Sequence, residues 1–318
     1  MSFISISIDI CGSTEAKARL RGHSALIGTE AKELYNTFHR QILRVEQTFW
    51  TLLRSSKLDI KRVFLIKSIG DEVWYRYDLE ELADYECRAA VAMMIEALVS
   101  LQTKDFDLVA GPLENPEDWE SVNPDTLIRI DMPLKITMDV ITEALDVGEV
   151  REKYLAPHVA SLLSPLGKPV KPIQAGDDDY INLCNRLGIA SQVKTERKVL
   201  SVVRSDYIGW QIDRFFRLTK ASIKNAVLIG PEILSDFDTH NMFAGEEAES
   251  QSHPGWSISK PMIRVCHGPH EFTSLENYIL ARRVLPAEEQ KGVGEGCNIG
   301  ILYYKYGRDV ELKTPPAA

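Results

Sequence analysis

Two stretches of the sequence decide the fold: Phe3–Thr14, FISISIDICGST, and Arg62–Tyr77, RVFLIKSIGDEVWYRY. In the first stretch isoleucines alternate with serines and Asp9, which is the period-two pattern of a half-buried strand. The second has apolar runs on either side of Ile69-Gly70-Asp71, and this pattern predicts a hairpin. If the strands are neighbours, Asp9 and Asp71 meet at one end of a sheet. They would bind Mg²⁺ or Mn²⁺ there, because a hard cation takes one or two carboxylates and leaves its other positions for phosphate oxygens.

After Asp9 and Ile10 the sequence reads Cys11-Gly12-Ser13-Thr14. If a helix begins at this point, the backbone N–H groups of Gly12 and Ser13 are free to point at a phosphate. Carboxylates beside a phosphate-facing turn indicate nucleotide chemistry.

The composition is that of an ordinary globular protein, with 318 residues, 44% hydrophobic and 26% charged. A net charge of −9 argues against nucleic acid or an anionic membrane as a partner, since both need a basic surface. No apolar run approaches the roughly 20 residues that cross a bilayer, and the chain opens on a strand rather than a signal peptide. We therefore expect a cytoplasmic protein. The five cysteines show no CxxC spacing and predict neither disulfides nor a zinc site: Cys11, Cys87, Cys184, Cys266 and Cys297.

Hydrophobic periodicity predicts the remaining elements. The expected order is a helix within 24–53, the hairpin, a helix from a capping box at Asp78 and Glu81 to about 101, and a loop over 104–128. It continues with strands at 129–141 and 199–203, a helix at 209–220, a strand at 226–229, and structured patches at 274–284 and 297–306. This order is typical of an α+β fold with an antiparallel or mixed sheet and flanking helices. We expect a catalytic domain over 1–235, with an insertion at about 145–198, and a C-terminal extension of unknown role over 236–318.

The two opening motifs resemble those of the class III nucleotidyl cyclases, the family of adenylate and guanylate cyclase catalytic domains. Asp9-Ile10-Cys11-Gly12-Ser13-Thr14 resembles the family's metal motif, and Lys67-Ser68-Ile69-Gly70-Asp71 resembles its Lys-x-x-Gly-Asp hairpin. The resemblance implies a class III cyclase-like domain with two Mn²⁺ or Mg²⁺ ions held by Asp9, Asp71 and the backbone carbonyl of Ile10. It also implies that Lys67 approaches the nucleotide base.

Two segments compete for the third motif of that family, an Asp followed by Gly, Asn and Arg at the start of a helix. The segment with Asn182 and Arg186 has the Asn–Arg spacing but lacks the preceding Asp and Gly. The segment Asp206–Leu218 is favoured because it has all the spacings, although Asp213 stands where the family has Asn. By resemblance, Arg217 stabilises charge on the phosphorus, Asp213 orients the ribose, and Asp206 contacts the base.

The implied reaction is attack of a ribose 3′-hydroxyl on the α-phosphate of a nucleoside triphosphate, at sites shared across a homodimer. The third motif, the insertion and the extension together resemble the pyrimidine cyclases of the bacterial Pycsar anti-phage systems. That resemblance implies conversion of UTP to cyclic UMP, or of CTP to cyclic CMP, as a messenger that activates a separate effector protein.

Aromatic residues near Asp213 favour a one-ring base, because side chains of this size can fill a base pocket. They are Tyr207, Trp210, Phe215 and Phe216, although the phenylalanines can also be core residues. An adenylate cyclase remains an alternative, since Lys67 and Asp206 match an adenine-selecting pair. A catalytically inactive regulatory module is the alternative from another class, and the presence of both aspartates and Arg217 argues against it.

Overall fold

The computed structural model describes most of the predicted catalytic region and parts of the C-terminal segment. The described residues are 2–16, 18–19, 44–69, 71–110, 128–155, 195–196, 199–240, 242–244, 248–249, 255–259, 262–263, 275, 277–290 and 296–312.

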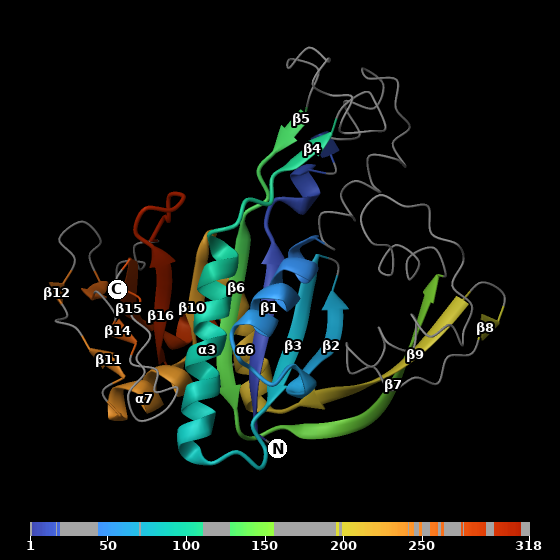
Figure 1. Ribbon diagram of the computed structural model, residues 1–318, viewed down its shortest axis with the longest axis horizontal. Coiled ribbons are helices and arrows are strands. Elements are labelled where there is room, and N and C mark those ends of the chain that lie inside the picture. The colour runs from blue at the N-terminus through green and yellow to red at the C-terminus, as the bar shows by residue number, and fades with distance from the viewer. Residues whose placement is uncertain are drawn as a thin grey trace.

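A nine-stranded mixed sheet forms the centre of the molecule (Figure 1). All neighbouring strands are antiparallel except β6 and β10, which are parallel. In spatial order the strands are β12 (Ala248–Glu249), β13 (Ser257–Ser259), β15 (Tyr278–Leu285), β16 (Cys297–Tyr304), β10 (Ala226–Ile229), β6 (Leu134–Ile141), β1 (Phe3–Ile10), β3 (Glu72–Asp78) and β2 (Val63–Ile69). With its flanking helices, this sheet confirms the predicted α+β fold class.

The opening strand β1 lies between β3 and β6, and the predicted hairpin is formed by β2 and β3. Asp9 is opposite Glu72 on one side and Lys135 on the other. Because directly opposed residues of antiparallel strands share a face, these three residues lie on the same face of the sheet. The alternation therefore predicted the face of the isoleucines correctly, but Phe3, expected on the same face, packs with Trp74 on the opposite one. The strand is also buried on both faces rather than half-buried.

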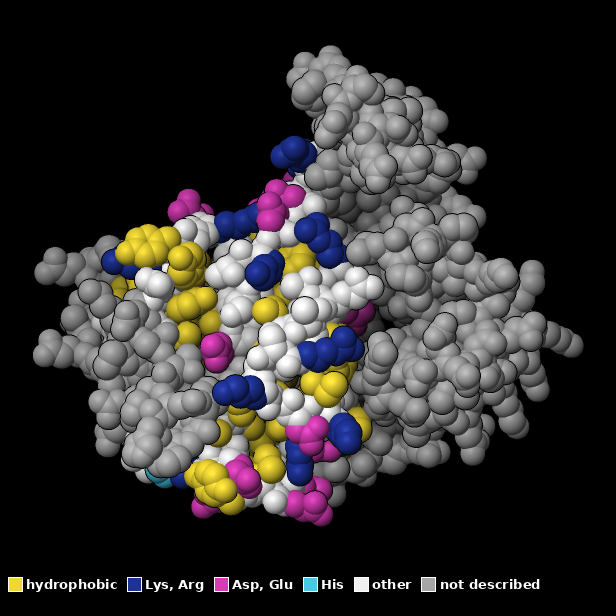
Figure 2. Space-filling model, viewed as in Figure 1, with side chains coloured by type: hydrophobic (Ala, Val, Ile, Leu, Met, Phe, Trp, Pro, Cys, Tyr) yellow, Lys and Arg dark blue, Asp and Glu magenta, His cyan; other side chains and the backbone are white. Residues whose placement is uncertain are grey.

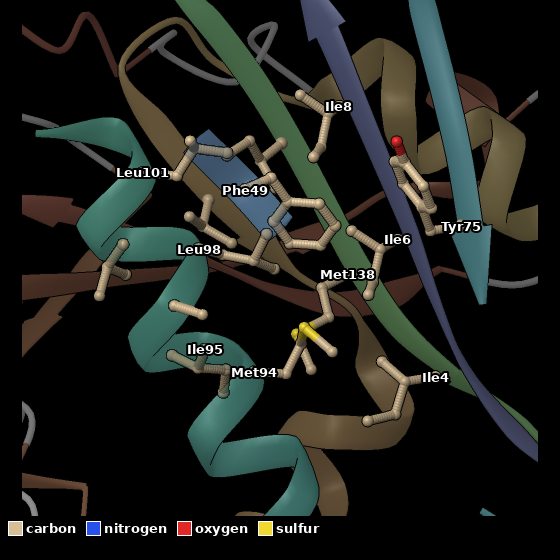
Figure 3. Close-up of a cluster of buried hydrophobic side chains, with 14 of the residues drawn as sticks. Ile4, Ile6, Ile8, Phe49, Tyr75, Met94, Ile95, Leu98, Leu101 and Met138 are labelled. Atoms are coloured by element: carbon tan, nitrogen blue, oxygen red, sulfur yellow. The ribbon is translucent and has the colours of Figure 1, made fainter. Parts of the chain in front are cut away.

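Helices cover both faces of the sheet (Figure 1). Residues 44–55 are helical, and the labelled helices are α3 (Asp84–Gln102), α6 (Trp210–Ala221) and α7 (Pro231–Thr239), with 3-10 turns at Ile60–Arg62 and Ala287–Gln290. Helix 44–55, α3 and α7 contribute to one apolar core with the isoleucines of β1. Figure 3 shows this core: Ile4, Ile6 and Ile8 point from β1 toward Met94, Ile95 and Leu98 of α3, with Phe49 beside them. Helix α6 covers the opposite face, where it packs on Phe3 and Trp74.

Three predicted boundaries were wrong. The capping box at Asp78 and Glu81 does not exist, because Asp78 is the last residue of β3 and α3 begins at Asp84. The backbone N–H of Ala83 instead donates to Glu86 Oε2 at 2.9 Å. The strand predicted over 129–141 is divided into β5 (Ile128–Ile130) and β6, since Pro133 has no N–H to donate to a sheet. The predicted loop 104–128 contains β4 (Leu108–Ala110), which pairs with β5.

A long two-stranded ribbon extends from the central sheet beside β2 (Figure 1). It consists of β7 (Leu145–Leu155) and β9 (Val199–Ile208), with the short β8 (Thr195–Glu196) on β9. The strand predicted at 199–203 therefore continues to Ile208. The predicted insertion, about 145–198, begins in β7, and residues 156–194 lie outside the described part of the chain.

The C-terminal segment contributes strands to the central sheet. The two predicted patches, 274–284 and 297–306, correspond to β15 and β16, and β16 pairs with β10. Helix α7 crosses the domain boundary predicted at about 235. A further short pair, β11 (Phe243–Ala244) with β14 (Met262–Ile263), lies outside this sheet. Continuous pairing from β2 to β15 therefore joins residues before and after 235 in one sheet.

The face drawn in Figure 2 has Lys and Arg interspersed with Asp and Glu. A membrane-spanning helix requires about 20 apolar residues, and no helix in the described part of the chain meets that requirement.

Candidate active site

The two motif aspartates lie together at one end of the sheet. Asp9 is the penultimate residue of β1, and Asp71 is in the turn that precedes β3. The backbone N–H of Ile10 donates to the carbonyl oxygen of Asp71 at 3.4 Å, which ties the turn to the end of β1. The structure therefore brings Asp9, Ile10 and Asp71 together, as the hairpin pattern predicted.

The electrostatics of Asp9 show an excess of negative charge. Burial, with the smaller effect of the carboxylates of Asp71 and Glu72, raises its pKa to about 6, although Lys135 lowers it. A carboxyl group with this environment is stabilised when a cation binds beside it. The ligand atoms are all oxygens, which suits Mg²⁺ or Mn²⁺ rather than a soft metal. Within the described residues no group of three His, Cys, Asp or Glu side chains has a metal-holding arrangement, so a metal here rests on Asp9, Asp71 and backbone oxygen.

A helix begins immediately after this carboxylate pair. Residues 13–16 are helical, and the N–H of Ala16 donates to the carbonyl of Gly12 at 2.8 Å, closing the first turn. Gly12 has φ 78°, a left-handed conformation that favours glycine. The first N–H groups of a helix have no partner within it and carry a partial positive charge. Gly12 and Ser13 thus lie at a helix N-terminus beside Asp9, and their role in phosphate binding stays a prediction.

Two charged residues of the site were not predicted. Lys135 is opposite Asp9 on β6, and both Lys135 and Lys224 lower the pKa of Cys11, although burial raises that pKa to about 11 overall. Glu72 is held by Ser7, whose Oγ donates to Glu72 Oε1 at 2.6 Å. The alternation in β6 placed Lys135 on a polar face, but only the strand register places it beside Asp9.

Helix 44–55 brings a further carboxylate, that of Glu46, close to Asp71. Glu46 accepts a hydrogen bond from the Tyr75 hydroxyl at 2.6 Å, and burial raises the pKa of Glu46. Glu46 and Asp71 both line a small cavity. Its other lining residues are aliphatic, apart from Tyr75. The spacing of Val45 and Phe49 predicted a core helix and concealed this polar residue.

The favoured third motif lies on two elements on the other face. Asp206 is on β9, and Asp213 and Arg217 are one turn apart on α6, with Asp213 exposed and Arg217 half-buried. No hydrogen bond or ion pair between described residues joins Asp213 or Arg217 to Asp9 or Asp71 in the same chain. The competing segment with Asn182 and Arg186 lies outside the described residues.

Lys67 lies on β2 opposite Trp74, next to an irregularity in the register after Leu65. Strand β3 lies between β1 and β2, so the backbone of Lys67 is not adjacent to β1.

The aromatic residues near Asp213 are not all available to a base. Phe215 is fully buried and Tyr207 is 3% exposed, so both are core residues. Phe216 is partly exposed and packs edge-on against Trp74, with ring centroids 4.8 Å apart. Trp210 is 49% exposed. The expectation of a pocket filled by both phenylalanines was therefore wrong for Phe215, because the helix turns it toward the sheet.

No protein-family model matches the chain, and no curated protein matches it. Solved structures of cyclase domains are similar to it in fold. The guanylate cyclase domain of RhGC from Catenaria anguillulae, in complex with GTP, is 9% identical over 95% of this chain and 96% of that chain, with a TM-score of 0.42. The adenylyl cyclase CyaB from P. aeruginosa is 11% identical over 95% and 93%, with a TM-score of 0.42. Monomeric adenylate cyclases from Trypanosoma brucei are 10% identical over 99% and 95%, with a TM-score of 0.40. At these values the likeness is loose.

Proposed function

We propose that the protein is a nucleotidyl cyclase that converts UTP to 3′,5′-cyclic UMP and pyrophosphate. The observation that carries the proposal is the meeting of Asp9 and Asp71 at the end of β1, directly before a helix N-terminus. Metal-binding carboxylates next to a phosphate-binding turn are the two parts that phosphoryl transfer requires.

Asp9, Asp71 and the carbonyl of Ile10 would hold two divalent ions, Mn²⁺ or Mg²⁺. When bound, such ions neutralise charge on the attacking and leaving oxygens of the reaction. Asp9 is available as a ligand at neutral pH, because a pKa of about 6 leaves it mostly ionised. The proximity of Asp71 favours a cation at this position, since the two carboxylates repel each other without one.

The phosphate chain would lie along the N–H groups of Gly12 and Ser13. Lys135 supplies positive charge from the neighbouring strand, where it is opposite Asp9. In the reaction the O3′–phosphorus bond forms as the bond to the leaving pyrophosphate breaks, and the 3′-hydroxyl loses its proton. The positioning of both ends of one molecule supplies much of the rate, since nucleophile and target are already joined.

The α6 residues act from the partner subunit of a homodimer in this proposal. Arg217 adds positive charge at the phosphorus, where negative charge develops, and Asp213 orients the ribose. The exposure of Asp213 supports this arrangement, because an exposed residue is available to a second subunit. Lys67 and Asp206 contact the base, and a monomer would be inactive.

UTP is the proposed substrate, with CTP second and ATP third. Trp210 and Phe216 are the aromatic side chains near Asp213 that reach the surface, and they favour a one-ring base. The cyclic nucleotide is proposed to act as a messenger in anti-phage defence by activating a separate effector protein.

The test is to incubate the pure protein with Mn²⁺ and each of ATP, GTP, CTP and UTP, and to identify the product by mass. We expect cyclic UMP, its loss in Asp9→Asn, and unchanged production in Asp309→Asn, a matched change at an exposed position. Cyclic CMP or cyclic AMP would correct the base and keep the reaction. Absence of product from all four nucleotides would contradict the proposed enzyme and favour the inactive regulatory module.

A further inference from the structure

Two buried side chains of helix α6 anchor it to β6 and to the residues that follow β6. Gln211 is 4% exposed, and its Oε1 accepts hydrogen bonds from the backbone N–H groups of Thr142 at 2.8 Å and Glu143 at 2.7 Å. The second side chain, Arg214, follows three residues later and so lies on nearly the same side of the helix.

Arg214 connects three elements. Its Nη2 donates to Glu232 Oε1 of α7 at 2.8 Å and lies 3.5 Å from Asp139 Oδ2 of β6. The ring of Trp210 covers the guanidinium at 4.7 Å from its centroid. The Arg214 side chain is only 8% exposed, so its charge is balanced by these partners rather than by water.

The two oxygens of Asp139 have different tasks. Oδ1 accepts from the N–H groups of Glu232 at 3.1 Å and Ile233 at 3.4 Å, and so caps the N-terminus of α7. Oδ2 accepts no hydrogen bond and faces Arg214. The carboxylate is held closely, because a Cβ on Gly230 would lie 2.2 Å from Asp139 Cγ. Capping requires one oxygen, so the charge on the second is directed at Arg214.

The contacts of Gln211 and Arg214 determine how α6 lies along the sheet. The helix starts beside the Asp139 end of β6 and ends at the other end, where the N–H of Asn225 donates to the Leu134 carbonyl at 2.9 Å. At 100° per residue, Asp213 lies about 130° and Arg217 about 90° around the helix axis from the side that carries Gln211 and Arg214. Asp213 is accordingly exposed and Arg217 half-buried. A rotation of α6 would therefore redirect both Asp213 and Arg217.

We propose that Asp139 and Arg214 are positioning residues, which set the rotation of α6 and thereby present Asp213 and Arg217 to the reacting phosphate. The inference rests on the proposed cyclase function. A buried ion pair is often no more stabilising than apolar residues of the same volume. Its value here is geometric, since the pair fixes one orientation of α6 relative to α7 and β6.

The decisive variant is Asp139→Asn, because the amide oxygen still caps α7 while the charge facing Arg214 is removed. The matched control is Asp238→Asn, which removes one partner of the Arg282–Asp238 ion pair at the other end of α7. At about pH 8, above the pKa of about 7 of Asp139, we expect kcat of Asp139→Asn to fall about 10- to 100-fold, with unchanged KM for UTP and unchanged Mn²⁺ dependence. Hydrogen exchange of the α6 amides should accelerate in Asp139→Asn and not in Asp238→Asn.

A double-mutant cycle with Arg217→Ala separates positioning from general damage. If Asp139 acts by placing Arg217, then Asp139→Asn should lower kcat much less in the Arg217→Ala background than in the wild type. A loss by the same factor in both backgrounds would overturn the proposal, because damage to the fold would not depend on Arg217.

Failure of the inference and failure of the proposed function are distinguishable. Unchanged exchange of the α6 amides in Asp139→Asn overturns the positioning role whether or not the protein is a cyclase. Absence of any cyclic product from the wild-type protein overturns the proposed function and, with it, a role in positioning Arg217.

Discussion

Asp9 and Asp139 lie at opposite ends of one row of polar residues on the sheet, and their environments differ. The row runs along β1 and β6, where Asp9 is opposite Lys135 and, four residues away, Ser5 is opposite Asp139. At one end Asp9 is half-buried beside two other carboxylates, and its pKa is raised to about 6. At the other end Asp139 is completely buried, caps α7 and faces Arg214.

The difference shows how to distinguish a binding carboxylate from a structural one. Asp139 has its partners within the chain, so its charge contributes to the arrangement of three elements. Around Asp9, the two other carboxylates outnumber Lys135, so negative charge is in excess and an added cation is favourable. The four predictions that follow test this contrast, from the largest expected effect to the smallest.

Replacing a carboxylate at the first end should abolish activity and leave the fold intact. For Asp71→Asn we expect product formation to fall by about 1000-fold, measured with UTP and Mn²⁺. The thermal midpoint should stay the same or rise, since the repulsion with Asp9 is removed. A marked fall in the thermal midpoint would show that Asp71 is structural and would remove the contrast.

Replacing Asp139, by contrast, should lower the stability of the fold. Asp139→Ala removes the cap of α7 and leaves Arg214 buried with one partner fewer, so we expect a loss of about 3–5 kcal/mol in the free energy of unfolding. Urea denaturation of Asp139→Ala and Asp9→Ala measures the comparison. Equal stability of the two variants would contradict it.

Added metal should stabilise only the first end. With Mn²⁺ at about 100 times its dissociation constant, linkage gives about 2.7 kcal/mol of added stability. We expect Mn²⁺ to raise the thermal midpoint of the wild-type protein and of Asp139→Asn, and a chelator to reverse the rise. The same rise in a protein carrying both Asp9→Asn and Asp71→Asn would place the metal elsewhere.

Asp139 should make the free energy of unfolding depend on pH. Burial raises the pKa of Asp139 from 3.8 to about 7, although Arg214 lowers it. The folded state therefore retains a proton that the unfolded state releases, and this stability is present at low pH and lost as pH rises toward 7. The expected slope is about 1.4 kcal/mol per pH unit between about 4 and 7.

Asp139→Asn should lack that contribution. The free energy of unfolding of the wild-type protein minus that of Asp139→Asn should thus fall between pH 5 and pH 7 and level off above. A difference that is constant with pH would mean that Asp139 is ionised throughout this range.

Local pattern predicted the elements whose signal lies within a few residues. The alternation in β1, the apolar runs around Ile69-Gly70-Asp71 and the stripe of α6 all gave the observed elements. The start of α3 was predicted wrongly because Asp78 can cap a helix or end a strand, and pairing with Phe3 of β1 selects the strand. The break between β5 and β6 has a local signal as well, because Pro133 has no N–H to donate.

The amino-acid sequence by itself determined the α+β class and placed Asp9 at the end of a strand and Asp71 in the turn of a hairpin, because both patterns are local. The pairing of β1 with β3 brings these two residues together. Only the tertiary structure decided that Lys135 and Glu72 lie beside Asp9 and that Phe215 belongs to the core. It alone joined Asp139 to Arg214 and Glu232. Those relations depend on strand register and on helix packing between residues far apart in the chain, 93 positions for Asp139 and Glu232 and more for Asp9 and Lys135. No periodicity within one segment specifies them.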